Sequence, residues 1–201
     1  QFVQMSTIAV FGSASRISET TPERPQTYYG SSKLKADKEL VAMSDREFKA
    51  AIIRPPMAYG GGMAPGNMLR LIRLVNKHIP LPFGSARNSR DFINVKNLVE
   101  FIHLAVEKEV EGVFYPTDKV PYSTRNVVEE ISRQLGVHTV NLPSPSIFLK
   151  LVEKVRPDLY QKLWGDVVID RQLALSAIGY EPRYTLEDGI REMVESFKQQ
   201  K

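Results

Sequence analysis

Two side chains of this sequence have the types and the spacing to move a proton. Tyr29 and Lys33 stand four residues apart at the start of a predicted helix over residues 29–45, and residues four apart lie on the same face of a helix. A free tyrosine, with a pKa of about 10, is a poor base at neutral pH. A lysine ammonium nearby favours the phenolate and lowers that pKa, so that the tyrosine can exchange a proton with a hydroxyl or carbonyl group. Tyr28 is the competing tyrosine, but its partner at this spacing is Ser32.

The same pair also fits an ordinary amphipathic helix, because a Tyr and a Lys at this spacing are common by chance. The choice between a proton-transfer pair and an ordinary helix therefore depends on the elements around Tyr29 and Lys33. Upstream, residues 2–11 are rich in apolar and β-branched side chains and end at Gly12, which predicts a β-strand. Ser6 and Thr7 lie toward the end of that strand, where we expect their hydroxyl groups to face a cleft.

The rest of the chain alternates between short strands and helices, which predicts an α/β fold. The strand over residues 49–54 is expected to be parallel to the first and ends at a Pro-Pro pair, because proline breaks the hydrogen-bond ladder. Thr185 and Asp188 form a capping box that opens the last helix. The predicted strands cover residues 2–11, 49–54, 92–95, 112–115 and 139–142, and the predicted helices cover residues 29–45, 67–77, 96–109, 123–135, 146–155, 158–164, 170–177 and 185–198.

Four segments resemble one known family in composition and in order: Ser6-Thr-Ile-Ala-Val-Phe-Gly12, Tyr29-Gly-Ser-Ser-Lys33, Ile53-Arg-Pro-Pro-Met-Ala-Tyr-Gly60 and Ser89-Arg-Asp-Phe-Ile-Asn-Val95. They resemble the NAD-dependent sugar-nucleotide epimerase/dehydratase family of the extended short-chain dehydrogenase/reductase superfamily, in its UDP-glucose 4-epimerase-like form. The resemblance covers nearly the whole chain and weakens after Val137.

By this resemblance the chain forms the C-terminal part of a Rossmann-type doubly wound parallel sheet plus a small α/β substrate-binding domain. Residues 1–56 and 92–112 would belong to the NAD(P)-binding domain, and residues 57–91 and 113–201 to the nucleotide-sugar-binding region. The family's coenzyme domain begins with a Gly-x-x-Gly-x-x-Gly turn that holds the pyrophosphate, and this sequence contains no such turn. We therefore expect a truncated chain, the C-terminal two-thirds of an enzyme, with roughly a hundred residues absent at about 30 residues per βαβ unit.

The resemblance also implies roles for individual residues. Thr7, Tyr29 and Lys33 would be catalytic: Thr7 hydrogen-bonds the reacting sugar oxygen, Tyr29 transfers the proton, and Lys33 assists it. Lys33 would also hold the nicotinamide ribose, so that Tyr29, Lys33 and Pro56 are the expected cofactor-binding residues. Substrate binding is expected from four further residues: Ser6, Asn67, Phe83 and Arg90.

Most of these residues have a simpler alternative. Arg90 would contact the nucleotide diphosphate in bidentate geometry, or it pairs with Asp91 at the surface. Asn67 would meet a phosphate at the start of its helix, or it only caps that helix. Phe83 would stack on a base or lie in the core, and Pro56 would line the nicotinamide pocket or only end a strand.

The sequence departs from the common family pattern at three places. Asn94 and Asn97 stand where the family often has His and Asp, at positions that are usually structural. A second family arginine is not found in residues 162–166, where Lys162 is the nearest substitute. These departures bear on the subfamily and on fine geometry more than on the class of reaction.

The resemblance predicts a nucleotide-sugar epimerase, reductase or dehydratase that uses hydride transfer to and from NAD or NADP. Two alternatives remain: a truncated, non-catalytic remnant that binds a nucleotide sugar or a partner chain, and a reductase of a non-sugar ketone. A sheet without its first strands would expose an unpaired edge. We therefore expect the chain to be a homo-oligomer or to associate with a missing N-terminal segment.

Composition narrows the class of protein. The 201 residues are 42% hydrophobic and 25% charged, and their net charge of +4 is spread among acidic residues, which disfavours a nucleic-acid partner. The absence of cysteine excludes disulfides and thiolate metal sites and fits the cytoplasm. His78, His103 and His138 are too scattered to predict a metal site. No apolar run is long enough to predict a membrane span.

Overall fold

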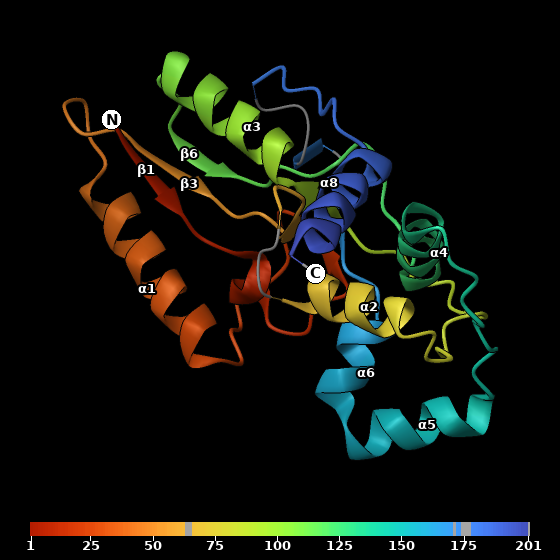
Figure 1. The fold of residues 1–201 in the computed structure, drawn as a ribbon. Coiled ribbons are helices and arrows are strands. Elements are labelled where there is room, and N and C mark those ends of the chain that lie inside the picture. The colour runs from red at the N-terminus through yellow and green to blue at the C-terminus, as the bar shows by residue number, and fades with distance from the viewer. Residues whose placement is uncertain (63–65, 171, 174–177, 201) are drawn as a thin grey trace. The chain divides into compact units, whose positions relative to one another are not determined.

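The computed structural model describes residues 1–62, 66–170, 172–173 and 178–200 (Figure 1). The chain forms two compact units, each built from several segments of the sequence. Unit 1 comprises residues 1–58, 91–120 and 167–183, and unit 2 comprises residues 59–90, 121–166 and 184–201. Residues 113–120 and 167–183, which the sequence assigned to the substrate-binding region, thus cluster with the first unit.

A parallel three-stranded sheet is the centre of unit 1. The strands β1 (Phe2–Met5), β3 (Ala50–Ile53) and β6 (Gly112–Phe114) lie in the order β1-β3-β6. All four residues of β3 are buried, which is typical of a central parallel strand with both faces covered. The predicted parallel α/β fold is confirmed.

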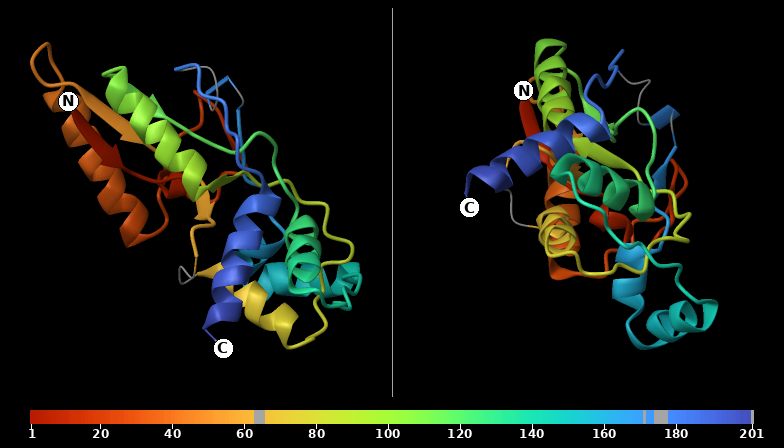
Figure 2. Two further views of the ribbon diagram at one scale, coloured as in Figure 1. Left: turned by 45° about the horizontal axis from the view of Figure 1, so that its top comes forward. Right: turned by 45° about the vertical axis from the view of Figure 1, so that its right-hand side comes forward.

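Two helices cover the opposite faces of this sheet, α1 (Tyr28–Met43) and α3 (Val95–Glu107) (Figures 1 and 2). Ala51 and Ile53 of β3 pack with Leu98 and Phe101 of α3 in one buried cluster. Successive strand residues point to opposite faces, so that Ala50 and Ile52 face the side on which α1 lies. Helix α1 contacts β3 and the turn η1 that follows β1.

The strand predicted over residues 2–11 is wrong in its second half. It ends at Met5, and residues Ile8–Phe11 form the 3-10 helix η1. Thr7 caps η1, because its Oγ1 accepts the N–H of Ala9 at 3.1 Å. The apolar side chains of this turn fill a second buried cluster, with Val10 and Phe11 packed near Leu34 of α1. Hydrophobicity alone does not separate a strand from such a buried turn.

Two short strand pairs complete unit 1. Strand β2 (Arg16–Ile17) runs parallel to β7 (Val168–Ile169), and β4 (Met57–Tyr59) pairs with β5 (Phe92–Asn94). Asp91 ties its segment to β7, since its Oδ2 accepts the N–H of Ile169 at 2.7 Å. The predicted helix over residues 170–177 lies largely outside the described residues.

Unit 2 is helical. Its helices are α2 (Asn67–Asn76), α4 (Thr124–Leu135), α5 (Ser146–Val155), α6 (Pro157–Leu163) and α8 (Leu186–Gln199). Helix α4 packs against both α2 and α8, and α5 packs against α6. The predicted boundaries of α4 are confirmed: Ser123 caps its start and Gly136 ends it in the left-handed conformation, at φ 71°. The strand predicted over residues 139–142 forms only a single bridge, between Leu81 and Asn141.

Asp188 gives α8 a pH-dependent cap. The backbone N–H and the hydroxyl of Thr185 donate to its carboxylate at 2.9 and 2.7 Å. These bonds, and next the guanidinium of Arg191, lower the pKa of Asp188 below its usual 3.8. A carboxylate whose folded pKa is lowered stabilises the fold above its unfolded pKa, and this contribution is lost as the pH falls through the folded value.

We therefore expect Asp188→Asn to lower the free energy of unfolding at pH 7 by about 0.5–1 kcal/mol. The difference from the wild type should shrink below about pH 4. It should vanish once the Asp188 carboxylate is protonated in both the folded and the unfolded protein. Urea titrations at several pH values measure it. Glu195→Gln, on the exposed side of the same helix, is the control and should change little. An Asp188→Asn deficit that persists at low pH would contradict this assignment.

Gly30 lets α1 approach η1 closely. A Cβ atom at Gly30 would lie 2.7 Å from the carbonyl oxygen of Ala9 and 3.1 Å from the Cβ of Pro25. We expect Gly30→Ala to lower the free energy of unfolding by about 1–3 kcal/mol through overpacking, although alanine is the better helix former. Ser31→Ala, at the exposed neighbouring position, should stay within about 0.5 kcal/mol of the wild type. Equal stability of the two variants would show that this contact is not tight.

Candidate functional site

One face of α1 presents the three polar side chains Tyr29, Lys33 and Asp37 at successive steps of four residues. Their exposure falls along the helix: Tyr29 is 56% exposed, Lys33 is half-buried and Asp37 is 1% exposed. Thr27 caps the helix by accepting the N–H of Gly30 at 3.1 Å. The phenol of Tyr29 is thus fixed to the first turn of a capped helix and stays open to a ligand.

Two bonds hold this helix face against the end of β1. The Nζ of Lys33 donates to the carbonyl oxygen of Met5 at 2.9 Å. The hydroxyl of Ser6 donates to Oδ2 of Asp37 at 2.7 Å. The structure therefore brings Lys33 to the end of β1, two residues before Thr7.

The two hydroxyl residues at this strand end behave differently. Ser6 is 5% exposed and its hydroxyl is used by Asp37, so that it does not face a cleft as expected. Thr7 is half-buried, and its Oγ1 accepts the N–H of Ala9. A hydroxyl that accepts one bond still has its own hydrogen to donate, and Thr7 keeps this donor for a ligand.

A buried arginine, which the sequence analysis did not single out, joins these elements. Arg54, at the end of β3, is 4% exposed; its Nε lies 2.9 Å from Asp37 Oδ2 and its Nη2 lies 2.7 Å from Glu23 Oε1. Its Nη1 donates to the hydroxyl of Tyr115 at 3.2 Å, and its guanidinium lies 5.5 Å from the ring centre of Phe11. One sequence signal could have found it: a charged residue stands between a fully apolar strand and a Pro-Pro pair.

Tyr115 stays a neutral partner in this cluster. Burial raises the pKa of the Tyr115 phenol, and the Arg54 guanidinium opposes that shift in part. The phenol is therefore protonated at neutral pH, and Arg54 has two carboxylates and one neutral oxygen as acceptors.

The residues after Arg54 lie at the same end of the sheet. Pro55 and Pro56 are buried, and the N–H of Ile8 donates to the carbonyl oxygen of Pro55 at 3.3 Å. This bond places Pro56 beside the turn that follows β1.

In unit 2, Arg90 is hydrogen-bonded to backbone carbonyl groups of the same unit. Its Nη1 donates to the carbonyl oxygens of Gln161 and Gly165, each at 2.7 Å. Burial lowers the pKa of the Arg90 guanidinium, and Asp166 opposes that shift. Arg90 thus fixes the end of α6 and does not form the surface pair with Asp91 that was the simpler alternative, since Asp91 bonds to β7.

Phe83 packs in the core of unit 2. It is 3% exposed, and its ring centre lies 5.1 Å from that of Trp164. Trp164 also contacts Phe148 and Tyr160, each at 6.2 Å between ring centres. These contacts make Trp164 the centre of an aromatic cluster in unit 2.

Asn67 is the first residue of α2 and not its cap. Gly66 holds the cap position and makes no side-chain cap bond. Beside this helix start lies a hollow of about 410 Å³ lined by Gly66, Asn67, Leu69, Arg70 and Arg73. Free N–H groups at a helix start and two arginines are the donors that a phosphate prefers.

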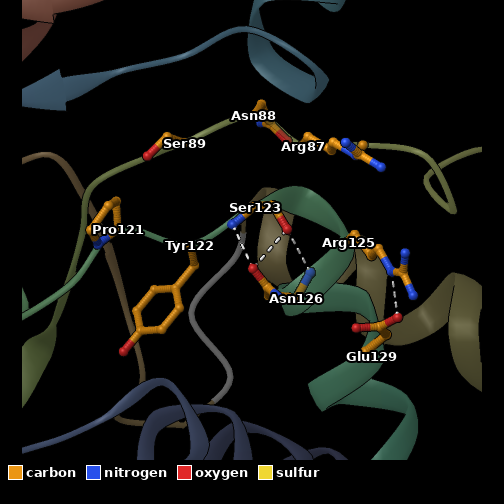
Figure 3. A pocket seen from close by; sticks show the side chains of 10 residues that line it. Arg87, Asn88, Ser89, Pro121, Tyr122, Ser123, Arg125, Asn126 and Glu129 are labelled. Carbon is orange, nitrogen blue, oxygen red and sulfur yellow. Dashed lines mark hydrogen bonds and ion pairs between the residues drawn. The ribbon is translucent and has the colours of Figure 1, made fainter.

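A second hollow, of about 490 Å³, lies at the start of α4 (Figure 3). Its wall is polar: Ser123 and Asn126 form the capping box of α4, and Arg125 pairs with Glu129 at 2.6 Å. Arg87 and Arg125 extend toward the same side of this hollow in Figure 3.

The departures from the family pattern are structural here. Asn94 caps α3 by accepting the N–H of Lys96 at 3.0 Å. Asn97 is fully buried, and its Nδ2 donates to Asp118 Oδ1 at 2.7 Å. Neither residue is exposed to a ligand.

Two further features are absent from the described part of the chain. No group of three or more His, Cys, Asp or Glu side chains there could hold a metal ion. Within the same residues no helix is both long enough and apolar enough to cross a membrane.

Comparison with known proteins places these features in a family. The model of the NAD dependent epimerase/dehydratase family matches residues 1–115. UDP-glucose 4-epimerase of Vibrio cholerae is 35% identical over 181 residues, which are 87% of this chain and 55% of that protein. dTDP-D-glucose 4,6-dehydratase of Mus musculus is 22% identical over 213 aligned positions, which cover 98% of this chain and 56% of that protein. The chain spans about 55% of the length of these curated relatives.

Solved structures share the fold. UDP-glucuronic acid 4-epimerase from Bacillus cereus, solved with NAD, superposes with a TM-score of 0.77 at 22% identity over 99% of this chain and 61% of that chain. dTDP-glucose 4,6-dehydratase from Bacillus anthracis, also solved with NAD, gives a TM-score of 0.72 at 22% identity over 98% and 61%. The expected Rossmann-type architecture is confirmed.

The cluster around Arg54 predicts a large effect of a conservative substitution. A lysine has one ammonium and cannot reach three acceptors in a planar fork, and breaking a buried ion pair is costly. We expect Arg54→Lys to lower the free energy of unfolding by about 2–4 kcal/mol. Arg125→Lys is the matched control, because its pair with Glu129 is half-exposed and should matter by under about 1 kcal/mol. Urea unfolding followed by circular dichroism compares them, and equal losses would contradict the special role of Arg54.

Proposed function

This chain belongs to the NAD-dependent epimerase/dehydratase family, and on that premise we propose that it carries the proton-transfer residues of a nucleotide-sugar epimerase, reductase or dehydratase. The observation that carries the proposal is the face of α1. It presents Tyr29, exposed on a capped first turn, one helical turn from Lys33, whose ammonium is bonded to the end of β1.

Each residue of the proposed catalytic set has a distinct task. Tyr29 removes the proton of a sugar hydroxyl or returns it to a ketone, since its phenol makes no hydrogen bond to the described residues. Thr7 donates its free hydroxyl hydrogen to the same sugar oxygen, because its acceptor side is taken by Ala9. Lys33, one helical turn from Tyr29 on the same face of α1, assists this proton transfer with its positive charge.

The donor set of α1 also fits a nicotinamide cofactor. Lys33 uses one N–H for Met5 and keeps two for ribose hydroxyls, with Tyr29 beside it and Pro56 at the neighbouring strand end. NAD or NADP, when bound, accepts and returns the hydride. The pyrophosphate is not assigned to residues of this chain, because the 201 residues contain no Gly-x-x-Gly-x-x-Gly turn.

For the substrate we propose a nucleotide-diphosphate sugar bound by unit 2. The hollow at the start of α2 offers Asn67, Arg70 and Arg73 to an anion. Arg90 keeps Nε and Nη2 for a phosphate, while Nη1 is bound to carbonyl groups. Ser6 and Phe83 are buried within their own units, so neither side chain is offered to the substrate directly.

The edge of the sheet supports a proposal about association. Strand β1 pairs with β3 and with no other described strand, and its Phe2 and Met5 are 44% and 37% exposed. A partner strand on this edge, from a longer chain or from a second copy, would complete its hydrogen bonds. We also place the protein in the cytoplasm, where a cysteine-free chain meets no disadvantage.

The alternative of a non-catalytic remnant rests on the 201 residues containing no Gly-x-x-Gly-x-x-Gly turn of their own. Titration of this chain with NADH, followed by nucleotide fluorescence, separates the two functions. Saturable, tight binding supports the enzyme, whereas binding of UDP-glucose alone supports the remnant. The non-sugar ketone reductase would be favoured by an Arg90 that faces solvent with no anion bound beside it; Arg90 is half-buried, and its Nη1 is bonded to the carbonyl oxygens of Gln161 and Gly165.

Tyr29→Phe provides the decisive test in the intact gene product. It should lower kcat for UDP-glucose or dTDP-glucose by about 10²- to 10⁴-fold with KM nearly unchanged, because only proton transfer is lost. Tyr28→Phe is the matched control: this neighbouring tyrosine is 98% exposed, and its removal should leave kcat within about twofold. Full activity of Tyr29→Phe would refute the assignment.

A further inference from the structure

We infer that Asp37 is a positioning residue for the catalytic set, whose buried carboxylate fixes the end of β1 and Arg54 against α1. The inference rests on the proposed function, because it assigns Asp37 the task of holding Thr7 where it can act with Tyr29. Asp37 itself touches neither substrate nor cofactor in this proposal.

The surroundings of Asp37 are unusual for a residue kept for stability alone. Its side chain is 1% exposed, and Oδ2 alone receives both bonds, from Ser6 Oγ at 2.7 Å and Arg54 Nε at 2.9 Å. Oδ1 is buried without a partner among the described residues. Burying a carboxylate with a bare oxygen is unfavourable, and a well-packed apolar residue would often serve stability better. The partners of Oδ2 supply another reason for its presence.

The first partner connects Asp37 to the catalytic strand end. Successive turns of α1 bind successive residues of the chain: Lys33 binds Met5 and Asp37 binds Ser6. Of the proposed catalytic pair, Tyr29 stands one helical turn before Lys33 on α1, and Thr7 directly follows Ser6 in the chain. The two bonds thus set the position of β1 along α1, and with it the position of Thr7 relative to the helix that carries Tyr29.

The second partner extends this constraint to the rest of unit 1. Arg54 belongs to the end of β3, and it also binds Glu23 from the loop before α1 and Tyr115 after β6. Loss of the negative charge at Asp37 would leave Arg54 with Glu23 as its single charged partner. The ends of β1 and β3 would then be free to shift against α1.

Amide hydrogen exchange tests this positioning without any cofactor or substrate. The N–H of Ser6 is bonded to Ile53 and that of Ile8 to Pro55, at 2.7 and 3.3 Å. Asp37→Asn keeps the size of the side chain and removes its charge. We expect exchange at both amides to accelerate by about tenfold or more, while exchange in helix α4 of unit 2 stays unchanged. Glu39→Gln, on the same helix with its carboxylate 65% exposed, is the control and should leave both amides unchanged.

Turnover of UDP-glucose by the intact gene product supplies the second readout. Asp37→Asn should lower kcat by about tenfold or more and leave KM within about twofold, and Asp37→Glu, which restores the charge, should recover part of the loss. Ser6→Ala should reproduce a smaller part of it. A variant that combines Asp37→Asn with Ser6→Ala should have the same kcat as Asp37→Asn alone, because Asp37 acts on Thr7 through Ser6.

The possible outcomes separate this inference from the proposed function. Unchanged exchange at Ser6 and Ile8 in Asp37→Asn overturns the inference, and so does faster exchange with normal kcat. A wild type without turnover refutes the proposed function, and the exchange result then decides alone whether Asp37 holds the strand end. If Asp37→Asn does not fold, Ser6→Ala carries both readouts, and its failure to alter either overturns the inference.

Discussion

The buried ion pair between Arg54 and Asp37 is the interaction on which the rest of unit 1 depends. Both side chains are almost fully withdrawn from water, so that each charge is tolerable only while the other is in place. Through this pair the end of β3 is joined to α1, and through Ser6 and Glu23 the end of β1 and the preceding loop are joined as well. The catalytic residues proposed here project from these same elements.

The two units solve different physical problems. Unit 1 surrounds a parallel sheet whose central strand is wholly buried, and such a sheet presents its functional groups at the carboxyl ends of its strands. Unit 2 packs amphipathic helices around α4 and gathers arginines and a free helix start on its surface. The first arrangement suits positioning and proton transfer, and the second suits an anionic ligand. Arg90 serves the second arrangement chiefly by holding the end of α6.

Membership of the NAD-dependent epimerase/dehydratase family is consistent with one chemical set serving several reactions. Removal of a hydroxyl proton and its return to a carbonyl are common to epimerisation, reduction and dehydration of a sugar. The Tyr29 and Lys33 face would therefore remain the same across these reactions, while the shape of the sugar site selects among them.

Features that depend on neighbours along the chain could be predicted from the amino-acid sequence. The helix boundaries with their caps at Ser123, Gly136 and Thr185 were predicted, because capping acts within four residues. The shared helix face of Tyr29 and Lys33 was predicted as well, since it depends only on their spacing. Three other features became visible in the fold alone: the first strand ends at Met5, Ser6 faces Asp37, and Arg90 binds the end of α6. These outcomes rest on contacts between residues 31 to 75 positions apart. Local pattern contains no information about such partners, since a buried charge is placed by whichever distant group can neutralise it.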